Sequence, residues 1–195
     1  MDQQQIIGIL RETGVMQEGH FLLTSGRHSD RYMQCARLFE HPGHSAALCA
    51  ALASLFADSS IDIVAGPALG GIILAYEVAR QLGARNLFAE RVDGVMTLRR
   101  GFAIPEESRV LVVEDVVTTG GSVREVLALV RAAGAQAVGV GAIVDRSGGA
   151  VDFGVPFRAA VSMDIASWDA ADCPLCRQGI PVVKPGSRKS AAPGA

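Results

Sequence analysis

The chain has 195 residues, of which 49% are hydrophobic and 19% are charged, and its formal net charge is −2. This length supports one sizeable hydrophobic core and is short for two. The small net charge gives no strong field that would recruit nucleic acid or an anionic membrane, so we expect neither as a partner. The N-terminal residues lack the basic segment of a signal peptide, and no apolar run is long enough to span a bilayer. We therefore expect a single-domain cytoplasmic protein.

The N-terminal third alternates helical and extended patterns. Apolar residues at helical spacing predict a first helix over residues 6–13, which ends at Gly14. Residues that favour β-structure flank residues 24–30, which predicts a hairpin or an extended loop there. A second helical stripe, over residues 48–56, follows a Pro-Gly pair.

Residues 61–165 show a regular alternation of strands and helices. Short apolar runs predict strands at 61–65, 86–89, 110–113, 137–144 and 158–162, with helices at 72–82 and 122–133. This order predicts an α/β fold in which helices flank both faces of a parallel sheet. We expect an N-terminal segment (1–60), this core (61–165), a C-terminal return segment (166–183) and a disordered tail (184–195), which together make one domain.

The most informative segment runs from residue 109 to residue 122. A buried strand is followed by Glu114 and Asp115, then by a turn of small residues, and then by a helix. Ser122 and Glu125 have the spacing of a capping box, which predicts that the helix begins at Ser122. The turn offers backbone N–H groups beside the positive end of a helix dipole, which suits a phosphate monoester. The two carboxylates suit sugar hydroxyls, a magnesium ion or a developing positive charge.

Two other strands of the predicted sheet end in segments that suit a ligand. In open parallel sheets, ligands bind outside the carboxyl ends of the strands. The glycine-rich turn at 66–71, which includes Gly70, lets backbone N–H groups approach an anion, although packing alone explains such a turn equally well. Arg146 lies just past the strand at 137–144. Taken alone, an arginine at such a position is most often a solvated surface residue.

A hairpin is predicted between the second and third strands of the core. Asp93 and Gly94 lie between two β-prone arms, which is a strong signal for a two-residue turn. The hairpin carries Arg91, Arg99 and Arg100, whose paired N–H donors suit pyrophosphate, and a solvated arginine hairpin is the alternative. An isolated two-stranded hairpin is marginally stable in water, so we expect this one to be mobile until a ligand binds.

The nine residues from Glu114 to Ser122, E-D-V-V-T-T-G-G-S, resemble the phosphoribosyl-pyrophosphate (PRPP) motif of type I phosphoribosyltransferases. The segment lacks the patterns of a P-loop and of a dinucleotide-binding turn. An ordinary strand-to-helix turn is the alternative, but nine consecutive matching positions with both flanking elements argue against it. The resemblance implies a Rossmann-like parallel sheet flanked by helices, with a small hood from residues 1–60 and 166–183.

A second segment, residues 19–34, resembles the Ser-Gly-Arg region of the orotate phosphoribosyltransferases in this family. The whole resemblance extends over roughly residues 6 to 183. It implies transfer of the phosphoribosyl group from PRPP to orotate in pyrimidine biosynthesis, with Mg²⁺ held mainly by PRPP. It also implies a homodimer whose mobile loop closes over the neighbouring subunit. The residues it assigns to orotate are Arg146 with Thr118, and Tyr32 and Met33 against the ring.

The same resemblance assigns the donor site. Glu114 and Asp115 are the expected catalytic pair, which faces the ribose hydroxyls and favours the positive charge that develops on the ribose. The reaction needs no protein nucleophile, so catalysis is expected to rest on positioning and electrostatics. The expected PRPP-binding residues are Gly70, Arg91, Arg99, Arg100, Glu114, Asp115, Val116, Val117, Thr118, Thr119, Gly120, Gly121 and Ser122.

The chain departs from the better-known members of the family. They have lysine before Ser-Gly-Arg and inside the glycine-rich turn, where this chain has Thr24 and Gly70. Their mobile loop carries lysine and histidine, whereas this one carries arginine, and the only lysines here are Lys184 and Lys189. Two alternatives stay open. A purine-salvage transferase leaves the Ser-Gly-Arg segment and Arg146 unexplained, and a non-catalytic PRPP sensor usually adds a nucleic-acid-binding module.

Cys173 and Cys176 have the spacing of half a zinc site or of a redox dithiol. The sequence does not indicate which residues would supply two further ligands; those to consider are Cys35, Cys49, His20, His28, His41 and His44. We favour a reduced pair packed at the domain edge, while zinc binding or the bridging of a dimer stays open. Four cysteines in a chain of this size do not indicate a disulfide scaffold.

Overall fold

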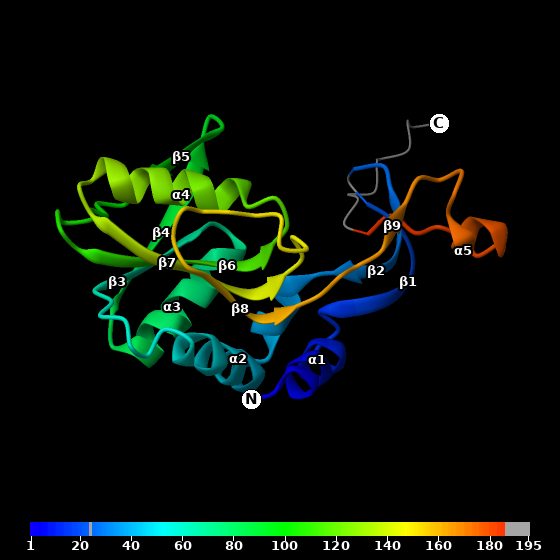
Figure 1. The fold of residues 1–195 in the computed structure, drawn as a ribbon, viewed down its shortest axis with the longest axis horizontal. Helices are drawn as coiled ribbons and strands as arrows, with labels where there is room; N and C mark the ends of the chain where they lie inside the picture. Colours follow the sequence, from blue (N-terminus) through cyan, green and yellow to red (C-terminus); the bar gives the residue numbers. More distant parts are fainter. Residues whose placement is uncertain (24, 186–195) are drawn as a thin grey trace, which may run out of the picture.

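The computed structural model describes residues 1–23 and 25–185, which form two β-sheets with flanking helices (Figure 1). The strands of the main sheet are β3 (Ile63–Pro67), β4 (Arg85–Val92), β5 (Val95–Leu98), β6 (Arg109–Val117), β7 (Gln136–Asp145) and β8 (Phe157–Ser162). They lie in the order β5-β4-β3-β6-β7-β8. All neighbouring strands are parallel except β4 and β5. The predicted α/β fold with a parallel sheet is confirmed.

Three helices cover the two faces of the main sheet, namely α2 (Pro42–Ser54), α3 (Gly70–Leu82) and α4 (Gly121–Ala132). Figure 1 shows α2 and α3 on one face and α4 on the other. Leu111 and Val113 of β6 pack into the core formed with α2 and α3, whereas Val110 and Val112 pack into the core formed with α4. Successive strand residues point to opposite faces of a sheet, so this run of apolar residues belongs to a strand buried on both sides.

A three-stranded sheet lies to one side of the main sheet (Figure 1). It consists of β1 (Met16–Leu22), β2 (His28–Met33) and β9 (Ser167–Trp168), and we call it, together with α5 (Pro174–Arg177), the hood. β1 and β2 form the predicted hairpin, and β2 also pairs with β9 in antiparallel register. The short 3-10 helix η1 (Cys35–Glu40) connects β2 to α2. The C-terminal part of the chain thus completes a sheet that the N-terminal part begins.

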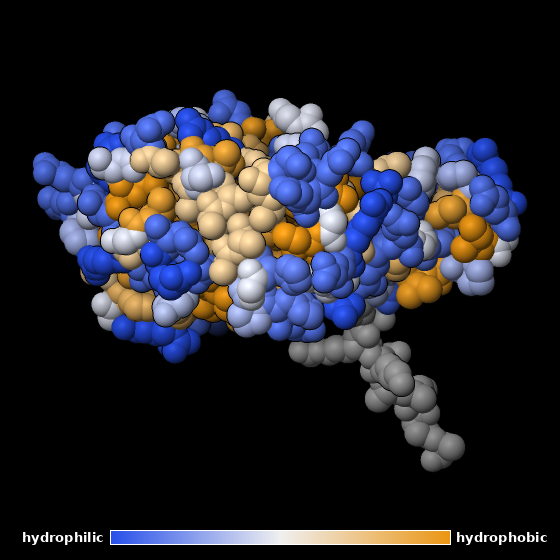
Figure 2. Space-filling model, turned by 90° about the horizontal axis from the view of Figure 1, so that it is seen from below, coloured by the Kyte–Doolittle hydropathy of each residue, from blue (hydrophilic) through white to orange (hydrophobic). Residues whose placement is uncertain are grey.

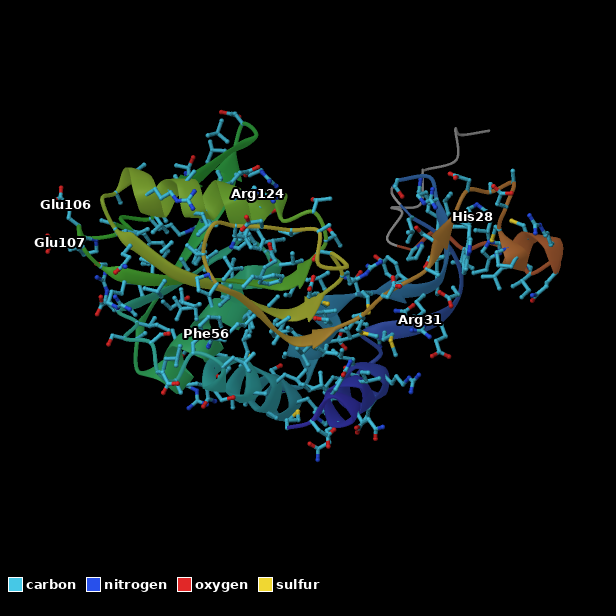
Figure 3. All side chains as sticks on the ribbon, in the orientation of Figure 1. His28, Arg31, Phe56, Glu106, Glu107 and Arg124 are labelled. Carbon is cyan, nitrogen blue, oxygen red and sulfur yellow. The ribbon has the colours of Figure 1, made fainter. Side chains whose placement is uncertain are left out.

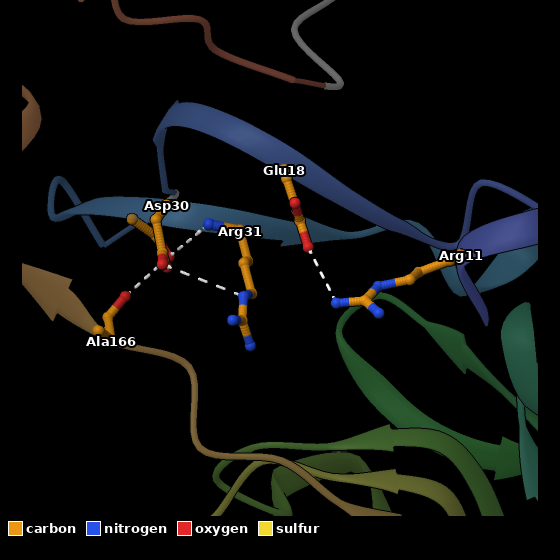
Figure 4. Close-up of polar contacts among 6 residues, drawn as sticks. Arg11, Glu18, Asp30, Arg31 and Ala166 are labelled. Carbon is orange, nitrogen blue, oxygen red and sulfur yellow. Dashed lines mark hydrogen bonds and ion pairs between the residues drawn. The ribbon is translucent and has the colours of Figure 1, made fainter. Parts of the chain in front are cut away.

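Polar contacts link the hood to its neighbours (Figure 4). Arg11 of α1 (Gln3–Glu12) forms an ion pair with Glu18 of β1 at an N···O distance of 3.2 Å. The Ser29 hydroxyl of β2 donates to the carbonyl oxygen of Ala166 at 2.8 Å. An exposed ion pair such as that between Arg11 and Glu18 contributes about 0–1 kcal/mol to stability. The ion pair between Arg11 and Glu18 therefore adds little to the stability of the contact between α1 and the hood.

The strand that carries the acid pair is longer than predicted. β6 does not end at residue 113 but continues through Glu114 and Asp115 to Val117. It continues because its pairing with β7 extends as far as Val117 and Asp145. The two acids are therefore held by a sheet and not by a turn.

The predicted capping box at the start of α4 is wrong. The helix begins at Gly121, and no side chain caps it. Gly120 precedes the helix with a φ of 73°, in the left-handed region that favours glycine. Glu125, the expected partner of Ser122, instead accepts two hydrogen bonds from Arg91 of β4, at 2.9 and 3.1 Å.

The C-terminal segment returns along β1. The N–H of Val183 donates to the carbonyl of His20, and the N–H of Leu22 donates to the carbonyl of Val183, both at 2.8 Å. Thr24 and residues 186–195 lie outside the described residues, so the predicted disorder of that part of the tail stays a prediction. None of the described helices is both long and apolar enough to cross a membrane.

Candidate active site

Glu114 and Asp115 lie near the carboxyl end of β6, which points toward the side of the main sheet where the hood lies (Figure 1). Burial, followed by the neighbouring Asp115 charge, raises the pKa of Glu114 to about 8. Burial also raises the pKa of Asp115. The N–H of Val116 donates to Asp115 Oδ1 at 2.8 Å, which fixes the position of that carboxyl group. Such a pair favours a positive charge placed beside it, because that charge restores the ionised form of both acids.

The glycine-rich turn packs directly against the acid pair. A methyl group placed on Gly70 would lie within 2.8 Å of the Asp115 carboxyl carbon. A methyl group on Gly66 would lie 2.6 Å from the carbonyl oxygen of Gly71. A larger residue at position 66 would therefore distort the turn itself, and one at position 70 would displace the Asp115 carboxyl group or move the turn away from β6. The turn and the acid pair belong to one site.

The residues that follow the acid pair form a pocket at the N-terminus of α4, which we call the loop pocket. Its volume is about 270 Å³, and its lining is Arg91, Glu114, Val116, Val117, Thr118, Thr119, Gly120, Gly121, Ser122 and Val123. A Cβ on Gly120 would lie 2.7 Å from the ring of Phe153, so this turn requires glycine for space as well as for its φ. The start of α4 supplies the positive end of a helix dipole to the pocket.

Two further pockets adjoin the loop pocket, and together we call them the acceptor pocket. One, of about 410 Å³, is lined in part by Met33, Asp115 and Arg146. The other, of about 380 Å³, is lined in part by Tyr32, Thr118 and Arg146. Arg146 is common to both, and Thr118 also lines the loop pocket. The structure thus brings all four residues predicted to bind orotate to one place beside the acid pair.

Arg146 follows β7 and is half-buried between the two parts of the acceptor pocket. Its backbone N–H donates to the carbonyl of Val117 at 2.8 Å, which holds the residue beside the loop pocket. Burial lowers the pKa of its guanidinium group. Its Nε is buried and has no hydrogen-bond partner among the described residues. A buried donor without a partner is costly, so this position suits an anionic ligand with acceptor oxygens.

The predicted β4–β5 hairpin forms, with Asp93 and Gly94 at its turn and φ values of 50° and 84°. It is better anchored than expected. Val95 is 65% exposed, but Met96 is only 6% exposed and packs into the core under α4. The mobility predicted for this hairpin stays a prediction.

The three hairpin arginines do not form one cluster. Arg91 lines the loop pocket and pairs with Glu125 of α4. Arg99 and Arg100 instead lie near Glu90, with N···O distances of 4.0 and 3.2 Å, and neither lines the loop pocket or the acceptor pocket. Of the predicted pyrophosphate clamp, the structure places only Arg91 at the site.

Two residues that the sequence did not suggest lie at the site. Lys184, assigned above to a disordered tail, lines the acceptor pocket with Tyr32 and Arg146. Cys35 lines it beside Asp115, and burial raises the pKa of its thiol. Lys184 reaches the pocket because the backbone before it pairs with β1, and no local sequence pattern reveals that pairing.

Comparison with known proteins identifies the class. Residues 36–153 match the family model of the phosphoribosyl transferase domain. That range includes the acid pair, the whole loop pocket and Arg146. The chain therefore belongs to the phosphoribosyltransferase family, and it has the type I fold that the sequence predicted.

Within this family, the chain is similar over nearly its whole length to proteins named orotate phosphoribosyltransferase. The one from Caldanaerobacter subterraneus subsp. tengcongensis is 58% identical over 189 residues, which cover 97% of this chain and 100% of the relative. The one from Pelotomaculum thermopropionicum is 59% identical with the same coverage. Among solved structures, Mycobacterium tuberculosis orotate phosphoribosyltransferase in complex with inorganic phosphate has a TM-score of 0.67 at 27% identity, covering 82% of this chain and 95% of that chain.

Proposed function

We propose that the protein transfers the 5-phosphoribosyl group of PRPP to orotate, which yields orotidine 5′-phosphate and pyrophosphate in pyrimidine (UMP) biosynthesis. The observation that carries this proposal is the half-buried Arg146, whose Nε lacks a partner in the described chain. Its pocket neighbours include Tyr32, Met33 and Thr118. A guanidinium group offers paired N–H donors to a carboxylate, and a flat ring fits beside Tyr32. The names of the full-length relatives support orotate as the acceptor.

The loop pocket is the proposed binding site for the 5′-phosphate of PRPP. Thr118, Thr119 and Ser122, together with the N-terminus of α4, line a space suited to a phosphate monoester. The turn that contains Gly70 is the proposed site for pyrophosphate, because only glycine allows the backbone to come so close to Asp115. The ribose between these two groups then lies beside the acid pair.

The acid pair is the proposed catalytic element. The reaction breaks the bond between ribose C1 and pyrophosphate and forms a bond from C1 to an orotate nitrogen. Positive charge develops on the ribose as the first bond breaks, and the carboxylates of Glu114 and Asp115 stabilise it. Their raised pKa values make this interaction stronger in the transition state than in the ground state, because the developing charge favours the ionised acids. No side chain needs to act as a nucleophile.

The acid pair also fits a magnesium ion. Mg²⁺ prefers oxygen ligands and is usually bound through one or two carboxylates, several waters and substrate phosphates. We propose that PRPP holds most of the ion's coordination and that Glu114 and Asp115 contact it through water. When bound, the ion neutralises charge on the pyrophosphate leaving group.

A homodimer is the proposed assembly. Leu69, Ile73 and Tyr76 are 84%, 50% and 60% exposed, and their spacing places them on one face at the start of α3. Figure 2, which shows the molecule from below, shows hydrophobic residues exposed in the middle of that face. Large exposed apolar patches mark association surfaces, so we propose that a second copy covers this face.

Tyr76→Asp should yield monomers in light-scattering measurements. A variant that stays dimeric would place the interface elsewhere.

We also propose that the hairpin arginines act on the neighbouring subunit. This would explain why Arg99 and Arg100 lie outside both pockets of their own chain. The test mixes an Arg99→Ala/Arg100→Ala subunit with an Asp115→Asn subunit after dissociation and reassociation. A mixed dimer with one intact site should regain activity. Confirmed mixed dimers that stay inactive would contradict action between subunits.

The direct test of the function is a panel of acceptors. The purified protein is incubated with PRPP, Mg²⁺ and, separately, orotate, uracil, adenine, guanine or hypoxanthine, and pyrophosphate release is measured. We expect pyrophosphate to be released only in the incubation that contains orotate. Turnover of a purine would support a salvage transferase, and PRPP binding without any turnover would support a PRPP sensor.

A cytoplasmic location, and the lack of nucleic-acid and membrane partners, stay predictions.

A further inference from the structure

Two histidines and two cysteines converge in the hood, away from the pockets described above. His20 lies on β1, His28 starts β2, and Cys173 and Cys176 lie at the start and inside α5. One potential ligand atom from each residue lies within 4.8 Å of all the others. Figure 3 shows His28 on the hood near α5. None of the four lines the loop pocket or the acceptor pocket.

Three distances within this cluster match those between ligands that share one metal ion. Zinc bonds of about 2.0–2.1 Å to nitrogen and about 2.3 Å to sulfur place tetrahedral ligand atoms about 3.3–3.8 Å apart. The Cys173 and Cys176 sulfurs lie 3.5 and 3.8 Å from His20 Nε2, and the Cys176 sulfur lies 3.3 Å from His28 Nδ1. The two histidine nitrogens are closer, at 2.7 Å. To surround one ion, the two imidazoles would move slightly apart, and any pair near the 4.8 Å limit of the cluster would move together.

The hydrogen bond at Nδ1 of His20 favours the tautomer of the imidazole that binds a metal through Nε2. Its Nδ1 lies 2.7 Å from the carbonyl oxygen of Ile180. A carbonyl oxygen only accepts, so Nδ1 carries the proton, and Nε2 of the neutral ring presents its lone pair to the cluster. Metal-binding histidines usually donate their other N–H to such an oxygen, which orients the ring.

The segment that contains the two cysteines, residues 164–185, buries few side chains apart from those of the cluster. Between residues 164 and 185, Cys173 is the only buried residue, although this segment forms β9 and α5. His20 and His28 are themselves 3% and 7% exposed, so the cluster is enclosed on the side of the β1–β2 hairpin. A bond network between these four residues would connect the C-terminal segment to a hairpin about 150 positions earlier in the chain.

We propose that His20, His28, Cys173 and Cys176 bind one structural Zn²⁺ ion. Two thiolates and two neutral imidazoles form the Cys₂His₂ set that zinc takes in tetrahedral structural sites. The two thiolate charges balance the charge of the ion, which allows it to sit among largely buried groups. Four protein ligands leave no open position for substrate, so this ion holds the hood together and takes no part in the transfer reaction.

Metal analysis of the purified full-length chain tests the proposal. The protein is expressed in zinc-supplemented medium, purified without chelators or metal-affinity resin, and analysed by mass spectrometry for metals. We expect about one zinc per chain. Cys176→Ser and His28→Asn should reduce zinc at least about tenfold after dialysis against a weak chelator, since such sites lose affinity steeply when a ligand is removed. Cys49→Ala and His44→Asn are the matched controls, and both should keep the zinc.

Cobalt replacement and proteolysis provide readouts that do not depend on activity. With Co²⁺ in place of zinc, we expect the intense visible bands of tetrahedral coordination and a thiolate charge-transfer band, which Cys176→Ser weakens. Removal of the metal should expose the bond after Arg177 in α5 to trypsin, whereas the zinc-loaded protein resists. Three results would each overturn the proposal. The purified protein could lack metal and take up none, it could contain a Cys173–Cys176 disulfide, or both ligand variants could keep the zinc.

Discussion

The main sheet and the hood are stabilised in different ways. The central strand β6 is buried on both faces, with Val110, Leu111, Val112 and Val113 all fully enclosed. The C-terminal part of the hood, residues 164–185, buries one side chain and depends on backbone pairing, polar contacts and the four-residue cluster. The groups proposed to act on the reacting atoms thus lie on the rigid element, whereas the weakly packed element supplies one wall of the acceptor pocket. Changes in the first region should alter turnover, and changes in the second should alter acceptor binding or local stability.

The largest effect is expected from the acid pair on β6. Asp115→Asn removes one charge that we propose stabilises the developing positive charge, so kcat should fall roughly 10²–10³-fold, equivalent to about 2.7–4 kcal/mol. The thermal unfolding midpoint should change little, because the two side chains have similar shapes. Asp58→Asn, on the exposed loop after α2, is the matched control. Near-normal turnover by Asp115→Asn would remove Asp115 from the catalytic role.

The second-largest effect is expected from Arg146, which lines the acceptor pocket. Arg146→Ala removes the donor proposed to bind the orotate carboxylate, a charged hydrogen bond of about 1.5–3 kcal/mol. KM for orotate should therefore rise, whereas KM for PRPP should stay within a small factor. Arg158→Ala, an exposed arginine on the neighbouring strand β8, serves as the control. Equal effects on both substrates would assign Arg146 a structural role.

A substitution in the glycine-rich turn tests how tightly the main sheet holds the site. Gly70→Ala places a methyl group within 2.8 Å of the Asp115 carboxyl carbon. Overpacking of this kind costs about 1–3 kcal/mol, so urea unfolding should show that loss together with weaker PRPP binding. The control is Gly43→Ala in α2, where a Cβ meets nothing within 4 Å and should stabilise the helix by about 0.5–1 kcal/mol. Equal stability of the two variants would contradict the close approach.

The last effect, which is small for any single step in pH, is a pH dependence from Glu114, whose pKa rises from 4.5 to about 8 on folding. Between these values the folded protein holds a proton that the unfolded chain has released, so stability falls as the pH rises from about 4.5 to about 8. Glu114→Gln should remove this slope, which is at most about 1.4 kcal/mol per pH unit for one proton, measured by urea unfolding without PRPP or Mg²⁺. Glu106→Gln in an exposed loop should leave the slope unchanged. Stability that rises with pH over this range would show that Glu114 is ionised in the folded protein.

The main sheet could be predicted because its signals are local. The run from Val110 to Ser122 contains a buried strand, two acids, a turn and a helix start in one contiguous segment, so the loop pocket follows from the sequence. Local reasoning was wrong where a distant residue intervened. Glu125 does not cap its own helix because Arg91 offers it two hydrogen bonds from β4, and β6 extends beyond residue 113 because β7 pairs with it.

The hood could be predicted only in part, for the same physical reason. The β1–β2 hairpin follows from its flanking residues, but β9 and the segment at Val183 pair with strands far away in the sequence. The position of Lys184 in the acceptor pocket depends on that pairing. The approach of Cys173 to His20, 153 residues away, is likewise set by the tertiary fold alone. The CxxC spacing favoured a reduced pair and left half a zinc site open, and it provided no means of choosing further ligands.

The pairing of Val183 with β1 has a consequence for biosynthesis. Chains emerge from the ribosome N-terminus first, and structure forms as segments become available. β6 and the loop after it are complete well before Val183 can reach His20 and Leu22. We therefore expect the loop pocket to assemble first, and the acceptor pocket to gain Lys184 only after the segment around Val183 has emerged and paired with β1. On a nascent chain, we therefore expect the proposed donor site to form before the proposed acceptor site is complete.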